Sequence, residues 1–418
     1  MILLGGALLP SPAMAWERAH LTALESIASD ELLAHIEVLA ADAYEGRSSG
    51  SRGGRAAAAY LVEQLEKRGV AGGAPDGGYY QSLQGGRRNV LAKVPGTDPE
   101  LADEWIVLGA HYDHVGYGNR RTSFGPIGYI HNGADDNASG VAALLELVEA
   151  LSANKVELRR SLLIAFWDGE EIGMIGSQHW ARHPTVPLRQ VKLAVNIDMI
   201  GRLREGRLEL LGSRTGFGLR KLASVAVDPG LWVDFTWEME PNSDHWTFVS
   251  RGVPTLMLHT GLHGDYHRPS DDVERLNIEG IRSVGRYLFD LTTAAADAPE
   301  LPTYRARGRD ESPKLQAQQE RPLEPLPAGT PTPRVGISWR EDRAEAGTVF
   351  LTRVAKGSPA ESAGLQVHDR LLAIDGQPFR NTVDFEQRLQ ALLAENADEI
   401  LLLTERRGRV EPRVIHPN

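Results

Sequence analysis

The sequence predicts an α/β domain, built on a mostly parallel mixed sheet flanked by helices, followed by a small C-terminal α+β domain. The chain has 418 residues, which exceeds one ordinary hydrophobic core and indicates two domains. Apolar runs of strand type alternate with helical patterns between residues 105 and 296. After residue 333 the pattern changes to short strands and turns, which is typical of a smaller, separate domain.

The N-terminal segment, MILLGGALLPSPAMA, is apolar and ends in a small-x-small sequence. It predicts a signal peptide at residues 1–15, with a mature chain that begins near Trp16 and is exported to the periplasm or the extracellular space. The positively charged start of such signals is missing, so an apolar tail is the alternative interpretation.

The first domain is expected at residues 16–300. Helical spacing of apolar residues predicts helices within 16–42 and 52–68, and again over 140–151 and 277–296. Strand-type apolar runs occupy 105–108, 161–167, 193–197 and 253–258. Because these runs are almost continuously apolar, they favour buried parallel strands rather than a sheet with one solvent-exposed face.

Residues 301–333 are rich in Pro, Gln and charge, which predicts an extended, semi-rigid linker. The second domain is expected at residues 334–418. Strands are predicted over 347–355, 370–374, 399–403 and 409–415, with an amphipathic helix over 383–393 and a turn at Asp375-Gly376.

The composition excludes several classes of protein. The net charge of -11 and the lack of a long Lys/Arg run disfavour a nucleic-acid partner. No stretch approaches the roughly 18 apolar residues of a membrane span. The chain has no cysteine, so thiol catalysis and cysteine-ligated metal are excluded, and any metal site must use His, Asp and Glu.

Acidic residues and histidines follow the predicted parallel strands in a regular way. They lie in five short segments: His111-Tyr-Asp-His, Asp135-Asp-Asn, Asp168-Gly-Glu-Glu, Asp198 and His263-Gly-Asp-Tyr-His. Ligands of α/β sheets bind beyond the carboxyl ends of the strands, so we expect these groups to converge. Individually, the segments have ordinary interpretations, such as a helix N-cap for Asp135-Asp-Asn or a solvated surface for the paired glutamates.

Convergence of so many carboxylates and imidazoles is costly unless a cation compensates them. His and carboxylate ligands without cysteine suit zinc, and manganese or cobalt are possible substitutes. Three carboxylates and one hydroxide carry about -4, which two divalent ions balance, and paired ions can activate a bridging water. The sequence therefore predicts two zinc ions per chain.

At these residues the chain resembles a known family. GAHYDHVG, NGADDNASG, WDGEEIGMIGS, NIDMIGR and DYHRPSDD are similar to successive motifs of the bacterial leucyl aminopeptidase family of two-zinc exopeptidases, metallopeptidase family twenty-eight. The resemblance implies that His111 and Asp198 hold one zinc and that Glu171 and His267 hold the other. It further implies that Asp135 bridges both ions and is joined to Asp136 by a cis peptide bond.

The resemblance also implies catalytic roles. Glu170 is expected to be the general base, Asp113 to orient the ring of His111, and Tyr266 to donate a hydrogen bond to the oxyanion. His114 is expected in the wall of the pocket, and Ser243-Asp244-His245 in a helix cap that supports it. The implied reaction removes N-terminal residues from peptides by attack of a metal-bridged hydroxide.

Residues 334–415 resemble a PDZ domain of the bacterial periplasmic-protease type, through GTVFLTRVAKGSPAESAGL and HDRLLAIDGQPF. The resemblance implies a groove that binds a protein C-terminus or an extended peptide by strand addition, with the backbone near Gly336 receiving the carboxylate. A packing module with an unused groove and a module that gates the peptidase are the alternatives.

Other functions on the same fold stay open at this point. They are an N-acyl amino acid deacylase, a carboxypeptidase, a glutaminyl cyclase with one zinc, and a non-catalytic protein that binds peptides through the PDZ groove.

Overall fold

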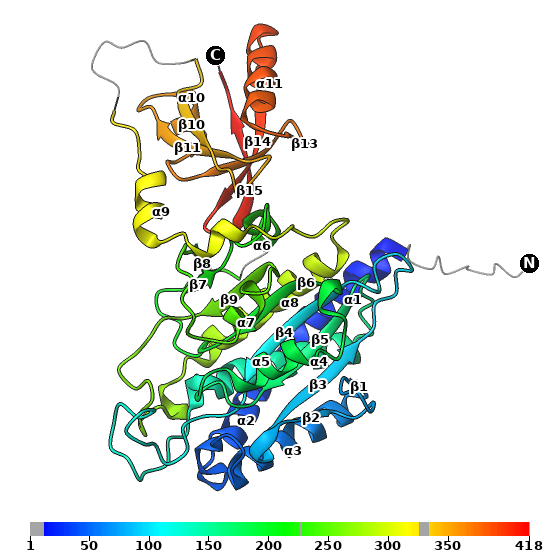
Figure 1. Cartoon of the computed structure of the whole chain (residues 1–418). Helices are drawn as coiled ribbons and strands as arrows, with labels where there is room; N and C mark the ends of the chain where they lie inside the picture. Colours follow the sequence, from blue (N-terminus) through cyan, green and yellow to red (C-terminus); the bar gives the residue numbers. More distant parts are fainter. Residues whose placement is uncertain (1–11, 226–227, 326–333, 418) are drawn as a thin grey trace, which may run out of the picture.

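The computed structural model describes residues 12–225, 228–325 and 334–417. Figure 1 shows a larger domain that carries a smaller C-terminal domain at one end. The predicted signal peptide at residues 1–15 falls outside the described residues, except for the start of helix α1 (Pro12–Ser26). Within the described ranges, no helix combines the length and apolar character needed to cross a lipid bilayer.

Four parallel strands form the middle of the larger domain's sheet. β4 (Trp105–His111) lies between β5 (Ser161–Trp167) and β6 (Val191–Ile197), and β9 (Thr255–His259) lies beside β6. β5 is buried along its whole length, and β4 is buried apart from Trp105. The predicted α/β architecture with a mostly parallel sheet is confirmed, and the four strand-type runs lie in these four strands.

Further strands, most of them antiparallel, extend both edges of this sheet. β3 (Arg88–Val94) pairs with β5, and β1 (Ala71–Gly72) and β2 (Tyr80–Ser82) pair with β3. At the other edge, β7 (Arg207–Leu211) runs antiparallel to β9. β8 (Trp232–Phe235) runs parallel to β7 and forms the outermost strand. Most of these strands are short, and β3 is interrupted by polar and charged residues, so the sequence pattern did not reveal them.

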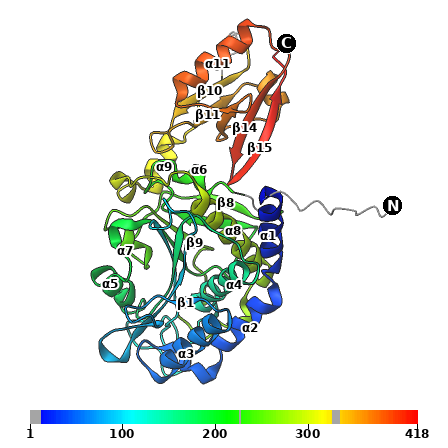
Figure 2. The same cartoon turned by 90° about the vertical axis from the view of Figure 1, so that its right-hand side faces the viewer.

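Helices cover both faces of the sheet, as Figure 2 shows. One face carries α1, α2 (Ser29–Leu39), α3 (Arg52–Lys67), α4 (Gly140–Ala153) and α8 (Ile278–Asp297), and the other carries α5 (Ile175–Arg182) and α7 (His245–Val249). The helical pattern over 16–42 forms two helices because Ala28 adopts an extended conformation between them. Short helical turns and α6 complete the domain: η1 (Asp42–Arg47), η2 (Gln84–Gly86), η3 (Ala134–Ser139), η4 (Leu188–Gln190), α6 (Leu219–Ala223) and η5 (Val273–Arg275).

The C-terminal domain is an antiparallel sheet closed by a helix, as predicted. Its strands pair in the order β10-β11-β12-β14-β15, with β13 beside β12. Their bounds are β10 (Ile337–Glu341), β11 (Val349–Val354), β12 (Arg370–Ile374), β13 (Gln377–Pro378), β14 (Ile400–Arg406) and β15 (Arg409–Ile415). The helices are α10 (Pro359–Ser362) and α11 (Thr382–Ala394), and Asn381 caps the latter. Leu351, Phe385 and Ile400 belong to a core that is separate from that of the larger domain.

The segment between the domains differs from the extended linker that its composition predicts. Residues 306–309 form η6 (Ala306–Arg309), and α9 (Pro313–Gln319) follows, with Ser312 as its N-cap and Pro313 at its start. Glu311 forms an ion pair with Arg305 inside this segment and another with Arg214 of the larger domain, and the second pair holds the segment against that domain. The rest of the predicted linker, residues 326–333, lies outside the described residues.

The two domains are in direct contact along the β7–β8 edge of the large sheet. Arg220 of α6 donates to both carboxylate oxygens of the buried Glu405, at 3.0 and 3.1 Å. Glu345 accepts hydrogen bonds from the backbone N–H groups of Arg220 and Lys221. The backbone N–H of Val233 in the edge strand donates to a carbonyl of the β14–β15 turn. Backbone and charged contacts together therefore fix the C-terminal domain on this edge.

Candidate metal centre

The carboxyl ends of the four parallel strands bring together the residues that the sequence singled out. His111 is the last residue of β4, and Asp198 directly follows β6. Glu171 lies in the loop after β5, and His267 lies in the loop after β9. His111, Asp198 and His267 are buried, with relative exposures of 1, 6 and 8 %. Parallel pairing places all four strand ends at one edge of the sheet, which explains the convergence.

One candidate metal group consists of His111, Asp136 and Asp198. The Nε2 atom of His111 lies 3.3 Å from an oxygen of Asp136 and 3.3 Å from an oxygen of Asp198. The hydroxyl of Ser243 donates to the other oxygen of Asp198 at 2.6 Å and fixes its orientation. Asn196 in turn donates to the Ser243 hydroxyl at 2.8 Å, so the carboxylate is held from behind by a buried chain of hydrogen bonds.

The second candidate group consists of His114, Asp136 and Glu171, with His267 beside it. His114 Nδ1 lies 2.6 Å from Glu171, and His267 Nε2 lies 2.9 Å from the other oxygen of the same carboxylate. Asp136 Oδ2 lies 3.1 Å from His267 and 3.7 Å from His114. Asp136 is thus common to both groups, and it directs one oxygen to each.

Asp136 therefore occupies the position between the two candidate metal groups that the resemblance assigned to Asp135. Asp135 belongs to neither candidate group: its Oδ1 accepts the N–H of Gly201 at 2.6 Å, and its Oδ2 lies 3.0 Å from His263. The cis peptide bond joins Asp136 to Asn137, and the expectation of one between Asp135 and Asp136 is wrong. The N–H groups of Asp135 and Asp136 both donate to Asp271, at 3.1 and 3.0 Å. This anchor leaves the two neighbouring carboxylates directed to different sides.

Two further residues of the centre were not assigned to it from the sequence. His114, expected in the pocket wall, contacts Glu171 directly because the chain after β4 turns back and bridges to Ser48. Arg47 was not singled out at all. Its buried guanidinium donates to the carbonyls of Leu39, Tyr112, Asn132 and Gly133, and so connects the loops that carry the ligands. A lone arginine in a loop gives no sequence signal of such a role.

The three predicted catalytic side chains lie at the centre. The Asp113 carboxylate accepts the N–H of Glu170 at 3.1 Å and lies 3.8 Å from His111 Nδ1, whereas its backbone carbonyl lies 3.1 Å from that nitrogen. Asp113 thus contacts His111 mainly through its backbone. The ring of Tyr266 lies against that of His267, with 3.9 Å between the centroids. Phe124, in the loop after β4, stacks on the same imidazole.

The buried carboxylates of the centre favour positive charge beside them. Burial lowers the pKa of His267, but the nearby carboxylates of Asp136 and Glu171 outweigh this effect and raise the pKa to about 11. Burial also raises the pKa of Glu170 well above its ordinary value; the His111 imidazole opposes this shift, and the Glu171 carboxylate adds to it. Asp136 and Asp198 have lowered pKa values despite burial, because histidines face them.

The donor set fits zinc. Three imidazoles and three carboxylates, all without sulfur, point their nitrogen and oxygen atoms at two shared positions. His267 Nε2 and His114 Nε2 are buried and make no hydrogen bond within the described part of the chain. Buried, ionised carboxylates in such close proximity are costly without a compensating cation, so the residues present fit a pair of metal ions.

Fold and site together define an α/β protein with a candidate metal centre made of two histidine–carboxylate groups. Comparison with known proteins agrees: the chain carries a domain of Peptidase family M28 at residues 89–292 and a PDZ domain at residues 350–407.

Several curated relatives carry aminopeptidase names. Aminopeptidase YwaD of Bacillus subtilis is 26% identical over 228 residues, which are 51% of this chain and 44% of that protein. Leupeptin-inactivating enzyme 1 of Streptomyces exfoliatus is 26% identical over 244 residues, which are 58% of this chain and 50% of that protein. The chain thus spans about half the length of the curated relatives it matches.

Solved structures show the same fold. The LapA aminopeptidase of Legionella pneumophila superimposes with a TM-score of 0.56 at 20% identity, over 68% of this chain and 76% of that one. An aminopeptidase from Aneurinibacillus sp. strain AM-1 gives a TM-score of 0.53 at 16% identity, over 68% of this chain and 98% of that one.

Proposed function

We propose that this protein is a zinc-dependent aminopeptidase that hydrolyses N-terminal residues from peptides. The observation that carries the proposal is the pair of His–carboxylate groups that share Asp136 at the carboxyl edge of the sheet, with Glu170 beside them. The M28 domain and the aminopeptidase names of several relatives support it.

Each group is proposed to hold one zinc ion. His111 and Asp198 would ligate the first, Glu171 and His267 the second, and Asp136 both, with His114 as a further ligand or a partner of Glu171. Manganese or cobalt would substitute, because the ligands are nitrogen and oxygen. When bound, the two ions lower the pKa of a shared water and polarise the scissile carbonyl.

Glu170 is proposed to take the proton of the attacking water and to pass it to the leaving amine. The raised pKa of Glu170 suits both steps, since a carboxylate with an ordinary pKa is a weak base. The hydrogen bond from its N–H to Asp113 fixes the start of its loop. The Tyr266 phenol, whose pKa is raised by burial and then by Asp136, stays protonated and can donate to the developing oxyanion.

The C-terminal domain is proposed to bind a protein C-terminus or an extended peptide. A groove of about 400 Å³ lies between β10 and α11, lined by apolar residues such as Ile337, Leu389 and Leu393. β10 is an edge strand, so its free backbone groups can pair with an added strand. The apolar N-terminal segment supports export to the periplasm or the extracellular space as a further part of this proposal.

The test combines metal analysis with kinetics on the full chain. Leucine p-nitroanilide and its N-acetylated form would be compared as substrates for the zinc-loaded wild type and for Glu170→Gln. We expect cleavage of the free-amine substrate only. The Gln variant should keep its zinc and lose about 10²–10⁴-fold in kcat, because proton transfer by a positioned base contributes that much.

Glu66→Gln serves as the matched control, because it makes the same chemical change at an exposed position on α3. Equal release of p-nitroaniline from the N-acetylated substrate would contradict an aminopeptidase, because such an enzyme requires a free α-amine, whereas release of acetate from it would favour a deacylase. Full activity of Glu170→Gln would contradict the role of that residue while leaving the metal centre intact.

A further inference from the structure

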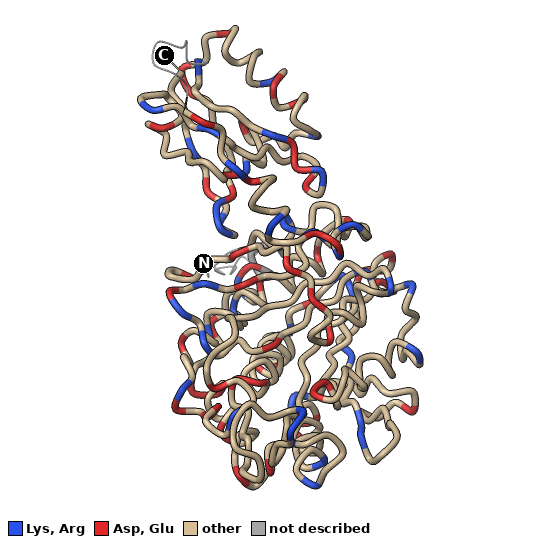
Figure 3. The backbone as a smooth tube through the Cα atoms, turned by 60° about the vertical axis from the view of Figure 1, so that its left-hand side comes forward, with Lys and Arg blue, Asp and Glu red and all other residues tan. Residues whose placement is uncertain are grey.

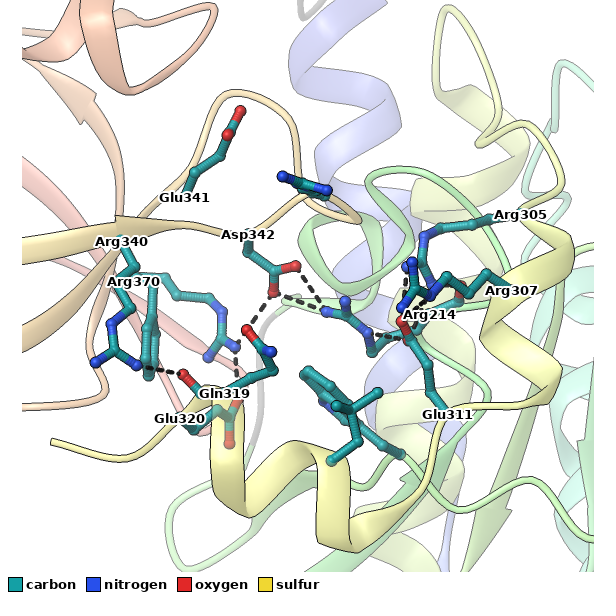
Figure 4. A pocket seen from close by; sticks show the side chains of 14 residues that line it. Arg214, Arg305, Arg307, Glu311, Gln319, Glu320, Arg340, Glu341, Asp342 and Arg370 are labelled. Carbon is teal, nitrogen blue, oxygen red and sulfur yellow. Dashed lines mark hydrogen bonds and ion pairs between the residues drawn. The ribbon is translucent and has the colours of Figure 1, made fainter.

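A second cleft, distinct from the metal centre, lies where the two domains and the segment between them meet. It has a volume of about 430 Å³. Arg214 and Trp237 line it from the larger domain, η6 and α9 from the connecting segment, and β10 with its following loop from the C-terminal domain (Figure 4). Arg214 and Trp237 follow β7 and β8, which run opposite to β9, so the cleft lies at the far end of the sheet from the metal ligands.

The cleft is held in shape by ion pairs. Arg214 donates to both oxygens of Asp342, at 2.7 and 2.9 Å, and to Glu311 at 2.5 Å. Its guanidinium also lies 3.7 Å above the ring centre of Trp237. Arg370 of β12 pairs with Glu320 at 2.8 Å. Buried arginines therefore already neutralise the carboxylates of Asp342, Glu311 and Glu320. Arg214 by itself connects the larger domain, the connecting segment and the C-terminal domain.

Basic charge remains after this pairing. Six arginines and four acidic residues line the cleft. Arg343 makes no side-chain hydrogen bond or ion pair within the described ranges, and Arg340 donates to the carbonyl of Gln319. Arg307 is 73 % exposed and lies 3.9 Å from Glu311, which two other arginines already engage. The fourth acid, Glu341, points away from the others in Figure 4.

The cleft also contains a buried hydrogen-bond donor that has no acceptor among the described residues. Arg370 is 3 % exposed, and its Nε atom finds no hydrogen-bond acceptor in the part of the chain that the structure describes. The chain as a whole carries a net charge of -11, and Figure 3 shows acidic and basic residues interspersed over both domains. The excess of arginines in the cleft is therefore opposite in sign to the net charge of the whole chain. Guanidinium groups favour carboxylates as partners.

The spacing of the arginines indicates the shape of the ligand. Arg340 and Arg307 lie at opposite ends of the cleft in Figure 4, with the Arg214–Asp342 pair between them. A single compact anion cannot contact both ends, whereas an extended chain with several carboxylates can. Trp237, Phe350 and Leu315 supply apolar wall between the charged groups, which suits the backbone and the methylene groups of a peptide.

We propose that this interdomain cleft binds an acidic peptide segment, whose carboxylates pair with Arg307, Arg340 and Arg343. The site shares no lining residue with the apolar groove between β10 and α11. It is therefore a binding surface of its own, and it is independent of the proposed peptidase activity. A bound acidic segment contacts both domains and so stabilises their docking.

The probe is an N-acetylated, C-amidated hexaglutamate with a fluorescent label, titrated against the full chain and followed by anisotropy. Blocked ends prevent it from acting as an aminopeptidase substrate or as a C-terminal ligand of the groove. We expect saturable binding with one site, weakened at least tenfold by the triple change Arg307→Gln, Arg340→Gln and Arg343→Gln. Affinity should also fall steeply with ionic strength, because the arginines are at the surface.

The matched control removes three exposed arginines elsewhere: Arg55→Gln, Arg189→Gln and Arg380→Gln. It loses the same net charge, so affinity within twofold of the wild type supports a specific site. Equal weakening by both triple variants, or binding of hexaglutamine with the same affinity, would overturn the proposal. Displacement of the probe by an equimolar concentration of inorganic phosphate would instead indicate a compact anion site and would also overturn it.

Discussion

The sharpest prediction concerns which of two neighbouring aspartates serves both metal positions. Asp136 directs one oxygen to His111 at 3.3 Å and the other to His267 at 3.1 Å, so its single negative charge lies between the two groups. The centre has three carboxylates, those of Asp136, Glu171 and Asp198. Asp136→Asn removes the first and leaves the other two. We expect zinc content to fall from two ions to at most one per chain, with more than hundredfold weaker binding, since loss of even an outer partner costs 10–100-fold.

Asp135→Asn is the matched comparison, because it makes the same change one residue away. Asn keeps an oxygen that can accept the N–H of Gly201, but it loses the charge that faces His263 at 3.0 Å. We expect both zinc ions to remain and stability to fall by about 1–1.5 kcal/mol, because the Gly201 N–H then donates to a neutral oxygen instead of a charged one.

Zinc would be counted by mass spectrometry after dialysis, and stability would be measured by urea unfolding with chelator present. If Asp135→Asn lost its zinc while Asp136→Asn kept both ions, the assignment of Asp136 as the shared ligand would be refuted. Asp135 would then be the shared ligand, as the family resemblance implied.

Three further predictions concern the support of the centre and the domain contact. Ser243→Ala removes the donor to Asp198 and should weaken one zinc site 10–100-fold in a chelator competition; unchanged affinity would contradict a positioning role. Burial, with help from Asp342, raises the pKa of Glu345 to about 7 from 4.5, so this residue favours the folded state most below pH 4.5 and loses that contribution as pH rises to 7. Between pH 4.5 and pH 8 the wild type should therefore lose up to about 3 kcal/mol of stability that Glu345→Gln does not lose, although the amide can accept only one of the two backbone N–H groups; the same pH dependence in both proteins would argue against it. Glu405→Ala leaves Arg220 without its buried partner and should cost about 3–5 kcal/mol in denaturant unfolding, and a loss below 1 kcal/mol would show that water replaces the carboxylate.

The sequence by itself determined the class of fold and the types of residue at the metal centre. Apolar runs at 105–108, 161–167, 193–197 and 253–258 mark the four parallel strands, because buried strands must be apolar on both faces. His111, Asp198, Glu171 and His267 follow from these runs, since the ends of parallel strands meet at one edge. The change of pattern after residue 333 likewise marked the second domain.

Only the tertiary structure decided which neighbours face the centre and how the domains meet. Asp136 rather than Asp135 lies between the histidines because Asp271, more than a hundred residues away, holds the backbone of that loop. The cleft lined by Arg214, Arg307 and Arg340 exists because three separate segments pack together, although composition alone predicted an extended linker. Side-chain direction in a loop depends on backbone angles that distant contacts impose, and local sequence does not contain those contacts.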